Sequence, residues 1–399
     1  MRRSEARVLR HAALPRPTLT STTFSGGGVV ASPSVERSRT FMPDTTVVAF
    51  PAGGPEHQRG EESLARAGVR LPVVHRAQGR PGGSSRDLWC EVRNRDGALT
   101  AGVVVKVEPS RKVPWLHLGR IRHAGQWLDA LHADRSIDTL VTLRRALRHR
   151  DPRLARLSVH AYRLGESALE QLEGELRARG WQQEARERDY QRTSLVSLAG
   201  DTDALSARLA YSARRGIRGV EKGGWRVRRI EDAAMAPRLQ FLHEQAHERT
   251  GGHASRVDLA AAVAASLADP TGSVVFGVYH PERTGPEALV GFVHGVLAED
   301  AVVYSTAGTE RAPDIGAAPL GYGMIWAVMC WAQALGVPWF DFGGITPEDQ
   351  PDHPLARISE FKRKFRGDEL RNASDWFADL SRLDATVLRL AGRLAALRR

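Results

Sequence analysis

Cysteine is scarce in this chain, with two residues (Cys90 and Cys330) among 399. Two thiols cannot build a disulfide framework or a cysteine-based zinc site, so the composition favours a reducing compartment such as the cytoplasm. Long apolar runs are missing too, because no stretch approaches the ~20 residues of a membrane-spanning helix. The first residues also lack the apolar core of a secretory signal. We therefore expect neither a disulfide-rich secreted protein nor a membrane-spanning one.

Acidic residues are in deficit, with 46 Asp and Glu against 57 Lys and Arg, which gives a net charge of +11. The remaining composition, 42% hydrophobic and 26% charged, is that of a globular protein. Its length suffices for about two domains of roughly 100–200 residues. The excess of positive charge favours a polyanion, a phosphate-bearing substrate or an anionic membrane surface as partner.

Residues 1–41 contain seven arginines, two glutamates and many Ser, Thr, Gly and Pro residues, without a helical or strand period. Such a segment cannot bury enough apolar surface to fold. Residues 51–60 and 76–85 are rich in Gly, Pro and Arg and are typical of linkers. We expect residues 1–85 to form a mostly disordered tail and linker, apart from a strand over 45–50.

From residue 86 onward, the hydrophobic pattern predicts a regular alternation of strands and helices. In the first half it predicts strands over 88–92, 99–107, 115–121, 157–161 and 193–198, and helices over 138–149 and 167–179. In the second half it predicts strands over 225–230, 273–279, 288–297, 302–307, 339–342 and 373–378, and helices over 202–221, 233–248, 257–268, 321–335 and 356–365.

Both halves share the order of three strands, a helix, a strand, a helix and a strand. This order resembles the acetyltransferase-like (GNAT) fold, so we expect an α+β chain with two tandem GNAT-like domains. The expected domains are residues 86–200 and 201–378, after the tail of residues 1–85. Residues 379–399 are expected to form a helix packed on the first domain, although its apolar stripe with interspersed arginines also suits anionic lipid.

One stretch of the second half carries an unusually distinctive sequence pattern. Residues 321–345 read G-Y-G-M-I-W-A-V-M-C-W-A-Q-A-L-G-V-P-W-F-D-F-G-G-I, and residues 358–367 read I-S-E-F-K-R-K-F-R-G. Residues 213–218, A-R-R-G-I-R, precede a Gly-Gly turn at 223–224. These segments resemble the Fem (FemABX) family of non-ribosomal peptidyltransferases over about residues 86–380.

The resemblance implies transfer of an amino acid from aminoacyl-tRNA to an amine, with the tRNA as co-substrate and no metal or redox cofactor. Lys362 matches the family lysine that stabilises the oxyanion, and Phe361 would hold its stem. An amine that attacks an ester builds negative charge on the carbonyl oxygen, which a fixed cation stabilises. The alternative is a solvated basic helix face above Phe361 and Phe365.

Several residues around this segment are further candidates. Asp341 suits either a general base or a structural partner for an amide or an arginine. Gly343 and Gly344 permit close approach of the backbone to a ligand, or a plain turn. Arg363 is a candidate for substrate or phosphate binding, and so is Arg249, which resembles a family residue at a helix end.

A basic segment runs from residue 208 to 229, with a single acid, Glu221. Arg214 and Arg218 lie one helical turn apart and, with Arg215, suit a pyrophosphate or an RNA backbone. The alternative is a solvated helix face. The basic residues of this segment are Arg208, Arg214, Arg215, Arg218, Lys222, Arg226, Arg228 and Arg229.

Two other activities fit parts of the chain. His243, His247 and His253 follow H-E-x-x-H-x(5)-H, which is close to a zinc-peptidase site, although Thr250 replaces the expected glycine. Acyl-CoA-dependent N-acyltransfer is the stronger alternative. GNAT enzymes hold pyrophosphate with Q/R-x-x-G-x-G/A, and residues 318–323, A-P-L-G-Y-G, keep the glycines without the Gln or Arg. A non-enzymatic RNA-binding or lipid-binding GNAT module is a further possibility.

The acceptor is the least determined partner, because the family's acceptor segment is not recognisable before residue 86. A peptidoglycan precursor peptide, lipid-linked or not, and an amine or peptide intermediate of an antibiotic both suit the chemistry. We expect no DNA partner, and a cytoplasmic protein that can work at the inner face of the membrane.

Overall fold

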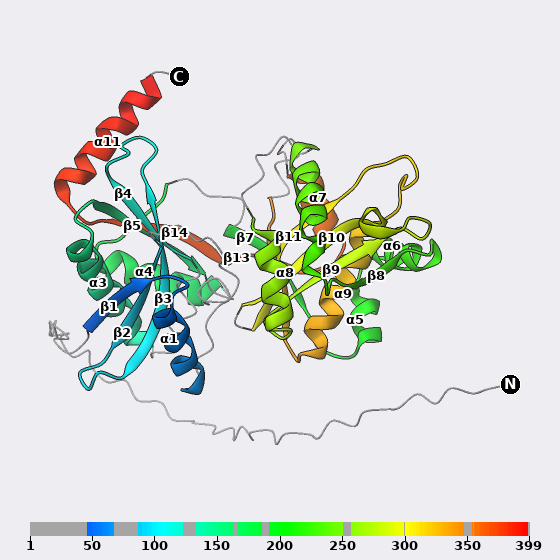
Figure 1. The fold of residues 1–399 in the computed structure, drawn as a ribbon, viewed down its shortest axis with the longest axis horizontal. Coiled ribbons are helices and arrows are strands. Elements are labelled where there is room, and N and C mark those ends of the chain that lie inside the picture. The colour runs from blue at the N-terminus through cyan, green and yellow to red at the C-terminus, as the bar shows by residue number, and fades with distance from the viewer. Residues whose placement is uncertain are drawn as a thin grey trace, which may run out of the picture. The chain divides into compact units, whose positions relative to one another are not determined.

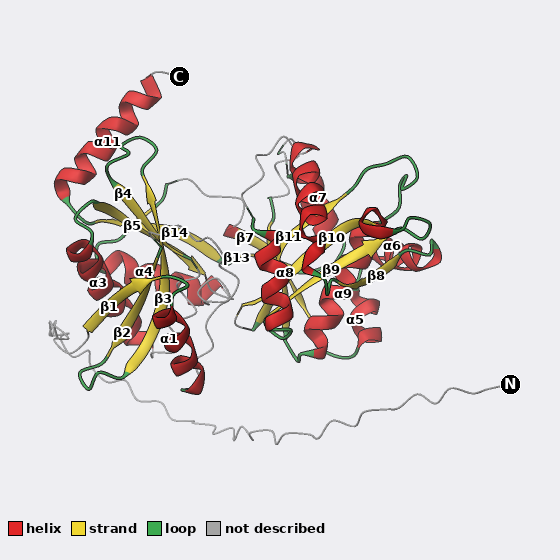
Figure 2. Ribbon diagram, in the orientation of Figure 1, coloured by secondary structure: helices red, strands yellow, loops and turns green. Residues whose placement is uncertain are grey.

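The computed structural model describes residues 46–67, 87–122, 133–162, 166–185, 191–249, 257–298, 300–346, 353 and 355–397. Residues 42–399 form one compact unit, which contains all of these. Its strands form two seven-stranded sheets, each covered by helices (Figures 1 and 2). Among the described residues, no helix combines the length and the hydropathy needed to cross a bilayer.

The first sheet is built mostly from the first half of the chain. Val103 and Val105 of its strand β3 form a core with Leu143 of helix α3 and Leu172 of helix α4. In the sheet β4 and β5 are parallel, and every other neighbouring pair is antiparallel. The strand order is β1 (Thr46–Pro51), β2 (Leu88–Arg93), β3 (Leu99–Pro109), β4 (His117–Ile121), β5 (Leu154–Tyr162), β14 (Ala373–Asp379) and β6 (Gln182–Gln183). Its helices are α1 (Pro55–Arg66), α3 (Ala133–Arg150) and α4 (Glu166–Ala178).

In the second sheet, the three consecutive strands predicted over 273–307 are confirmed, and they form an antiparallel meander of β9, β10 and β11. Val293 of β10 packs in one core with helix α9, and its neighbour Phe292 packs in another with helices α7 and α8. Since neighbouring strand residues point to opposite faces, these helices cover the two faces of the sheet. The order is β13 (Asp368–Arg371), β7 (Arg192–Ser197), β12 (Trp339–Gly344), β11 (Ala301–Thr309), β10 (Leu289–Ala298), β9 (Ser273–Tyr279) and β8 (Arg226–Arg229). The helices are α5 (Thr202–Arg208), α6 (Tyr211–Lys222), α7 (Ala236–Arg249), α8 (Leu259–Ala268), α9 (Leu320–Ala334) and α10 (Ala356–Arg363), with short 3₁₀ turns at Ala233–Met235 and Gly285–Ala288.

The two sheets exchange strands, which the sequence order did not predict. The strand over 193–198 was expected to close the first half, but β7 lies between β13 and β12 in the second sheet. Conversely, β14 was expected to complete the second half, but it lies between β5 and β6 in the first. That placement is wrong because hydrophobic periodicity identifies a strand without identifying its partner.

The expectation of a tail and linker before residue 86 is partly wrong. The strand over 45–50 is confirmed as β1, but residues 55–66, overlapping the expected linker, form helix α1. Pro55 suits the first helical position, and Leu64 is buried against Trp89. The rest of the expected tail, residues 1–45 and 68–85, lies outside the described residues.

The helix expected over 202–221 is broken into α5 and α6. The break falls at Leu209 and Ala210, where the Ala210 amide donates a hydrogen bond of 3.0 Å to the carbonyl of Lys364. The break therefore fastens the start of α6 to the end of α10.

Helix α11 (Arg382–Leu397) follows β14. Its Leu388 and Ala391 pack against Val113, Leu116 and Ala155 at the first sheet. Its Asp384 forms an ion pair of 2.8 Å with Arg148 of α3.

Candidate functional site

Lys362 lies where two parallel strands of the second sheet part. Strands β11 and β12 pair through Ala301–Val303 and Trp339–Asp341, although both strands continue beyond this pairing. The Lys362 ammonium lies 5.6 Å from the centre of the Tyr304 ring on β11. It donates a hydrogen bond of 2.5 Å to the Gly344 carbonyl on β12. The carboxyl ends of parallel strands that diverge are a common position for a ligand site.

The charge of Lys362 is nearly enclosed, since 6% of the residue is exposed. Burial lowers the pKa of the Lys362 ammonium to about 8, while the negative charge of Asp341 opposes that shift. Burial also raises the pKa of the Tyr304 hydroxyl to about 12, so this neighbour stays neutral. The site therefore contains a cation that is mostly protonated at neutral pH and weakly screened by water.

Asp341 is buried and receives hydrogen bonds on both carboxylate oxygens. Tyr162 of β5 donates at 2.6 Å, and Asn372, between β13 and β14, donates at 2.9 Å. Thr193 of β7 and the Gly343 amide donate to the other oxygen. This full set of donors favours a structural partner over a base that accepts a proton from a substrate.

Gly343 and Gly344 shape the end of β12. Gly343 has φ of +64°, a left-handed conformation that favours glycine over other residues. The Gly344 carbonyl accepts the Lys362 hydrogen bond. The pair thus forms an irregular end of strand β12 that contacts the cation.

Helix α10 is fastened to the segment after β12. Ser359 accepts hydrogen bonds of 2.9 Å from both the amide and the hydroxyl of Thr346. Arg363 donates to the Thr346 carbonyl at 2.6 Å and pairs with Glu369 at 2.6 Å. The Arg363 charge is thus engaged within the chain, which weakens its assignment to phosphate.

Phe361 packs on the start of α9. Its ring centre lies 4.9 Å from that of Tyr322 and 5.5 Å from that of Phe365. A Cβ placed on Gly321 would lie 3.3 Å from the Phe361 ring. These contacts fix the helix that carries Lys362. Phe365, expected on the same helix, lies two residues beyond its end at Arg363.

Glycines let α6 approach α9 closely. A Cβ on Gly216 would lie 2.5 Å from the Tyr322 ring, and one on Gly219 would lie 3.2 Å from Pro319. The R-G-I-R-G segment therefore turns its glycines toward α9.

The arginines of α6 lie away from that contact. Arg215 and Arg218 are exposed, while Arg214 donates to the Ala207 carbonyl at 2.8 Å. The structure thus joins α6 to α10 through Ala210 and Lys364, and no described contact joins these arginines to Lys362.

Arg249 ends α7 and lies apart from Lys362. Its guanidinium donates to the Thr309 carbonyl at 2.7 Å. Burial, with a smaller contribution from Arg311, lowers its pKa.

The histidines of α7 do not form a metal centre among the described residues. The rings of His243 and His247 lie 4.4 Å apart, and His243 shares a hydrogen bond of 3.2 Å with Thr306. Across the described part of the chain, no three His, Cys, Asp or Glu side chains are placed to hold a metal. His253 lies outside the described residues. The zinc interpretation therefore receives no support from this geometry.

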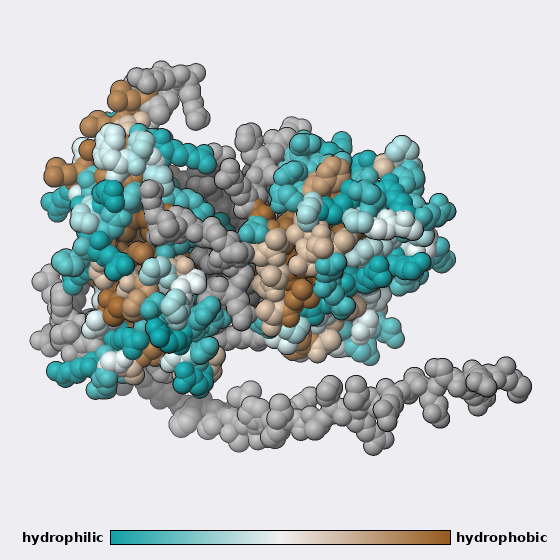
Figure 3. Space-filling model, viewed as in Figure 1, coloured by the Kyte–Doolittle hydropathy of each residue, from teal (hydrophilic) through white to brown (hydrophobic). Residues whose placement is uncertain are grey.

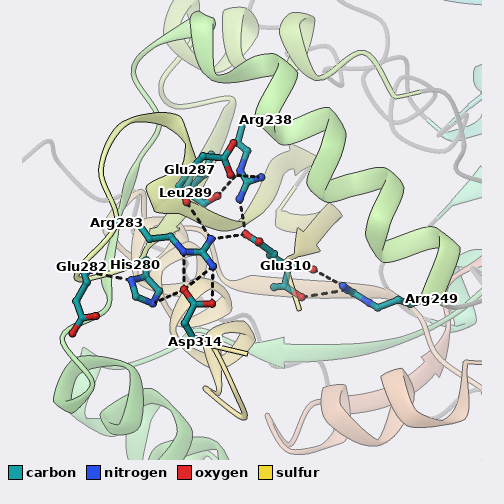
Figure 4. Close-up of polar contacts among 10 residues, drawn as sticks. Arg238, Arg249, His280, Glu282, Arg283, Glu287, Leu289, Glu310 and Asp314 are labelled. Atoms are coloured by element: carbon teal, nitrogen blue, oxygen red, sulfur yellow. Dashed lines mark hydrogen bonds and ion pairs between the residues drawn. The ribbon is translucent and has the colours of Figure 1, made fainter. Parts of the chain in front are cut away.

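An ion-pair network fixes the loop between β11 and α9 (Figure 4). Arg283 forms ion pairs with Asp314 at 2.8 Å and with Glu310 at 3.0 Å. Arg238 of α7 reaches the same Glu310 at 2.5 Å and donates to the Leu289 carbonyl at 2.9 Å. The network holds the loop in one conformation before α9 begins.

Some site residues have no signal in the sequence. Tyr304 and Tyr162 lie in ordinary strand patterns, and Thr193 and Asn372 come from distant segments. That Lys362 and Asp341 belong to one site could be predicted only from the resemblance to the Fem family.

Comparison with known proteins agrees with this architecture. Residues 207–363 match the family described as "Acetyltransferase (GNAT) domain". The matched span lies in the second half of the chain and ends one residue after Lys362. No curated protein matches in sequence.

The solved structures that this chain resembles are distant from it in sequence. The crystal structure of FemX matches with a TM-score of 0.59 and 14% identity, over 76% of this chain and 89% of FemX. L-PGS from Bacillus licheniformis matches with a TM-score of 0.49 and 12% identity, over 86% of this chain and 98% of that one. A tandem GNAT protein from the clavulanic acid biosynthesis pathway matches with a TM-score of 0.46 and 12% identity, over 84% of this chain and 99% of that one. The FemX likeness and the domain match confirm the predicted α+β fold with tandem GNAT-like domains.

Proposed function

We propose that this chain is an acyltransferase that moves an aminoacyl group from aminoacyl-tRNA to an amine. The observation that carries the proposal is the buried Lys362 ammonium between β11 and β12, next to the Tyr304 ring. A cation in a position with little water is suited to stabilise charge that develops during a reaction.

The reaction begins when the acceptor amine attacks the ester carbonyl carbon of the donor. A C–N bond forms, and the carbonyl oxygen becomes an oxyanion, which Lys362 stabilises. The ester C–O bond then breaks, the amine nitrogen loses a proton, and the ribose oxygen of the tRNA leaves with a proton. The products are an amide and a free tRNA, with no redox step. Holding amine and ester together supplies much of the rate enhancement.

The exposed cations of α6 support a phosphate-bearing donor. Arg215 and Arg218 lie on a helix whose other face is packed against α9. Because the backbone of this helix is already fixed, phosphate binding to its arginines costs little further backbone entropy. The fold likeness to FemX adds independent support, since the Fem resemblance itself rests on sequence segments.

Acyl-CoA is the second candidate donor, favoured by the match to a GNAT acetyltransferase domain. Contacts at the start of α9 argue against it. Pro319 is packed against Gly219 of α6, and Phe361 lies against Gly321. The Leu320 amide donates to Ala318 and the Tyr322 amide to Pro319, so both are engaged within the chain. Pyrophosphate binds a helix start through such amides.

The donor is tested by incubating the chain with a mixture of charged tRNAs and an amine acceptor, with acetyl-CoA in parallel. Acceptors include a peptidoglycan precursor peptide and amine-bearing peptides of the antibiotic type. We expect amide product from charged tRNA, abolished when ribonuclease is added first. Ribonuclease-insensitive product formed from acetyl-CoA would contradict the tRNA donor and leave acyl transfer intact.

A further inference from the structure

Helix α11 presents an apolar stripe on its exposed face. The four residues of the stripe follow one another at intervals of four, three and four positions, which places them on one face of the helix. Figure 3 shows the hydrophobic atoms of this helix at the surface of the molecule. The stripe consists of Leu383, Val387, Leu390 and Leu394, which are 81%, 40%, 54% and 59% exposed.

The opposite face of α11 is already occupied. Leu388 and Ala391 pack at the first sheet, Ala385 is 2% exposed, and Asp384 pairs with Arg148. The helix is therefore held in place by one face while the stripe points away from that contact.

The loop between β3 and β4 packs on the occupied face of α11. Its Val113 and Leu116 contact α11 residues, and Figure 1 shows this loop beside the helix. Trp115 of the same loop is 67% exposed. Lys112 reaches α11, with its ammonium 3.4 Å from where a Cβ on Gly392 would lie. We name the four stripe residues the α11 face.

Cations border the α11 face. Arg382, Arg389 and Arg393 are exposed and, at spacings of seven and four, share one flank of the helix. Arg111 and Lys112 are exposed in the neighbouring loop. Arginine stems can lie along an apolar surface while their charged ends reach outward.

We propose that the α11 face docks on an anionic lipid bilayer. An apolar stripe flanked by cations is the pattern of a helix that lies in the membrane interface. The positive border is complementary to anionic headgroups, whereas an ordinary protein interface core is depleted of charge. This inference is independent of the donor and acceptor of the proposed reaction.

The test is sedimentation of the full chain with vesicles of phosphatidylcholine alone or with added phosphatidylglycerol. We expect binding to the anionic vesicles, weakening as salt is raised. Leu390→Glu is expected to lower the partition coefficient about tenfold or more, because it puts a charge into the stripe that the bilayer would bury. Leu267→Glu, at a side chain of α8 that is 41% exposed, is the matched control and is expected to bind like the parent chain.

Both variants alter exposed side chains, and circular dichroism verifies that they fold like the parent. A parent chain that stays in the supernatant with anionic vesicles overturns the proposal. Equal binding by the parent and Leu390→Glu overturns it as well. A parent dimer that Leu390→Glu converts to a monomer, without vesicle binding, assigns the α11 face to a second copy of the chain and also overturns it.

Discussion

At the residue scale, the site combines Lys362, whose charge is costly to bury, with Asp341, whose carboxylate is fully hydrogen-bonded in the folded chain. Lys362 is enclosed, and burial lowers its pKa to about 8. Asp341 accepts hydrogen bonds on both oxygens. The first residue is therefore placed at a cost in stability, which is common at catalytic sites, while the second holds the surroundings together.

Replacing Lys362 by methionine is expected to stabilise the fold. A pKa of about 8 in the folded chain lies below the ordinary lysine value of 10.5. The unfolded chain therefore binds more protons between these pH values, and stability rises with pH across this window. Lys362→Met is expected to remove this dependence and to raise the free energy of unfolding at pH 7 by about 1–3 kcal/mol, measured by urea denaturation.

Lys364→Met is the matched control, since Lys364 pairs with Glu360 at the surface. Its stability is expected to stay within about 0.5 kcal/mol of the parent. A Lys362→Met chain less stable than the parent at pH 7 would mean that the Gly344 hydrogen bond outweighs the cost of burial.

Asp341→Asn is expected to destabilise the chain by about 2–4 kcal/mol, because an amide nitrogen would face hydrogen-bond donors. The measurement is urea denaturation, with Asp203→Asn at an exposed position of α5 as control. Unchanged stability in Asp341→Asn would refute the structural role given to this carboxylate.

The sequence could predict Lys362 but not its surroundings. Lys362 was predicted through the resemblance of its segment to the Fem family, because its spacing alone also fits a solvated basic helix face above Phe361 and Phe365. Tyr304, Tyr162 and Thr193 reach the site through strand pairing across long separations, which local pattern does not encode. For the same reason the sequence leaves Asp341 open between a base and a structural partner, because its donors come from distant segments.

At the scale of elements, glycine controls how closely α6 and α9 approach. Gly216 and Gly219 face Tyr322 and Pro319, and Gly323 of α9 faces Val220. The same contact orients the exposed arginines of α6. Helix positions were predictable from the 3.6-residue period, but the break between α5 and α6 was not, because it depends on the Lys364 carbonyl.

Gly216→Ala is expected to lower the free energy of unfolding by about 1–3 kcal/mol, because the added methyl would overlap the Tyr322 ring. Gly174→Ala in α4 is the matched control. No atom lies within 4 Å of its added Cβ, so helix propensity is expected to stabilise that variant by about 0.5–1 kcal/mol. A Gly216→Ala chain as stable as the parent would show that α9 can move aside.

At the scale of the whole molecule, the strand exchange joins the two sheets. β14 brings Trp376 into the core of the first sheet, and β7 brings Val196 into the core of the second. The hydrogen bond from Tyr162 to Asp341 links them again, at the candidate site itself. Neither sheet is complete without a strand from the other half of the chain, so a cut at residue 200 would break both.

This exchange predicts that the two sheets unfold together. In urea, far-ultraviolet circular dichroism and tryptophan fluorescence are expected to give one coincident transition. Two separated transitions would show that each sheet is stable without the strand it borrows.

The most direct test of the account is the initial rate of amide formation from aminoacyl-tRNA at pH 7, compared between the parent chain and Lys362→Met. We expect the variant to be slower by about 10²–10³-fold, the usual effect of losing one oxyanion-stabilising group, while its fold remains at least as stable. A Lys362→Met chain that transfers at the parent rate would contradict the role of this lysine.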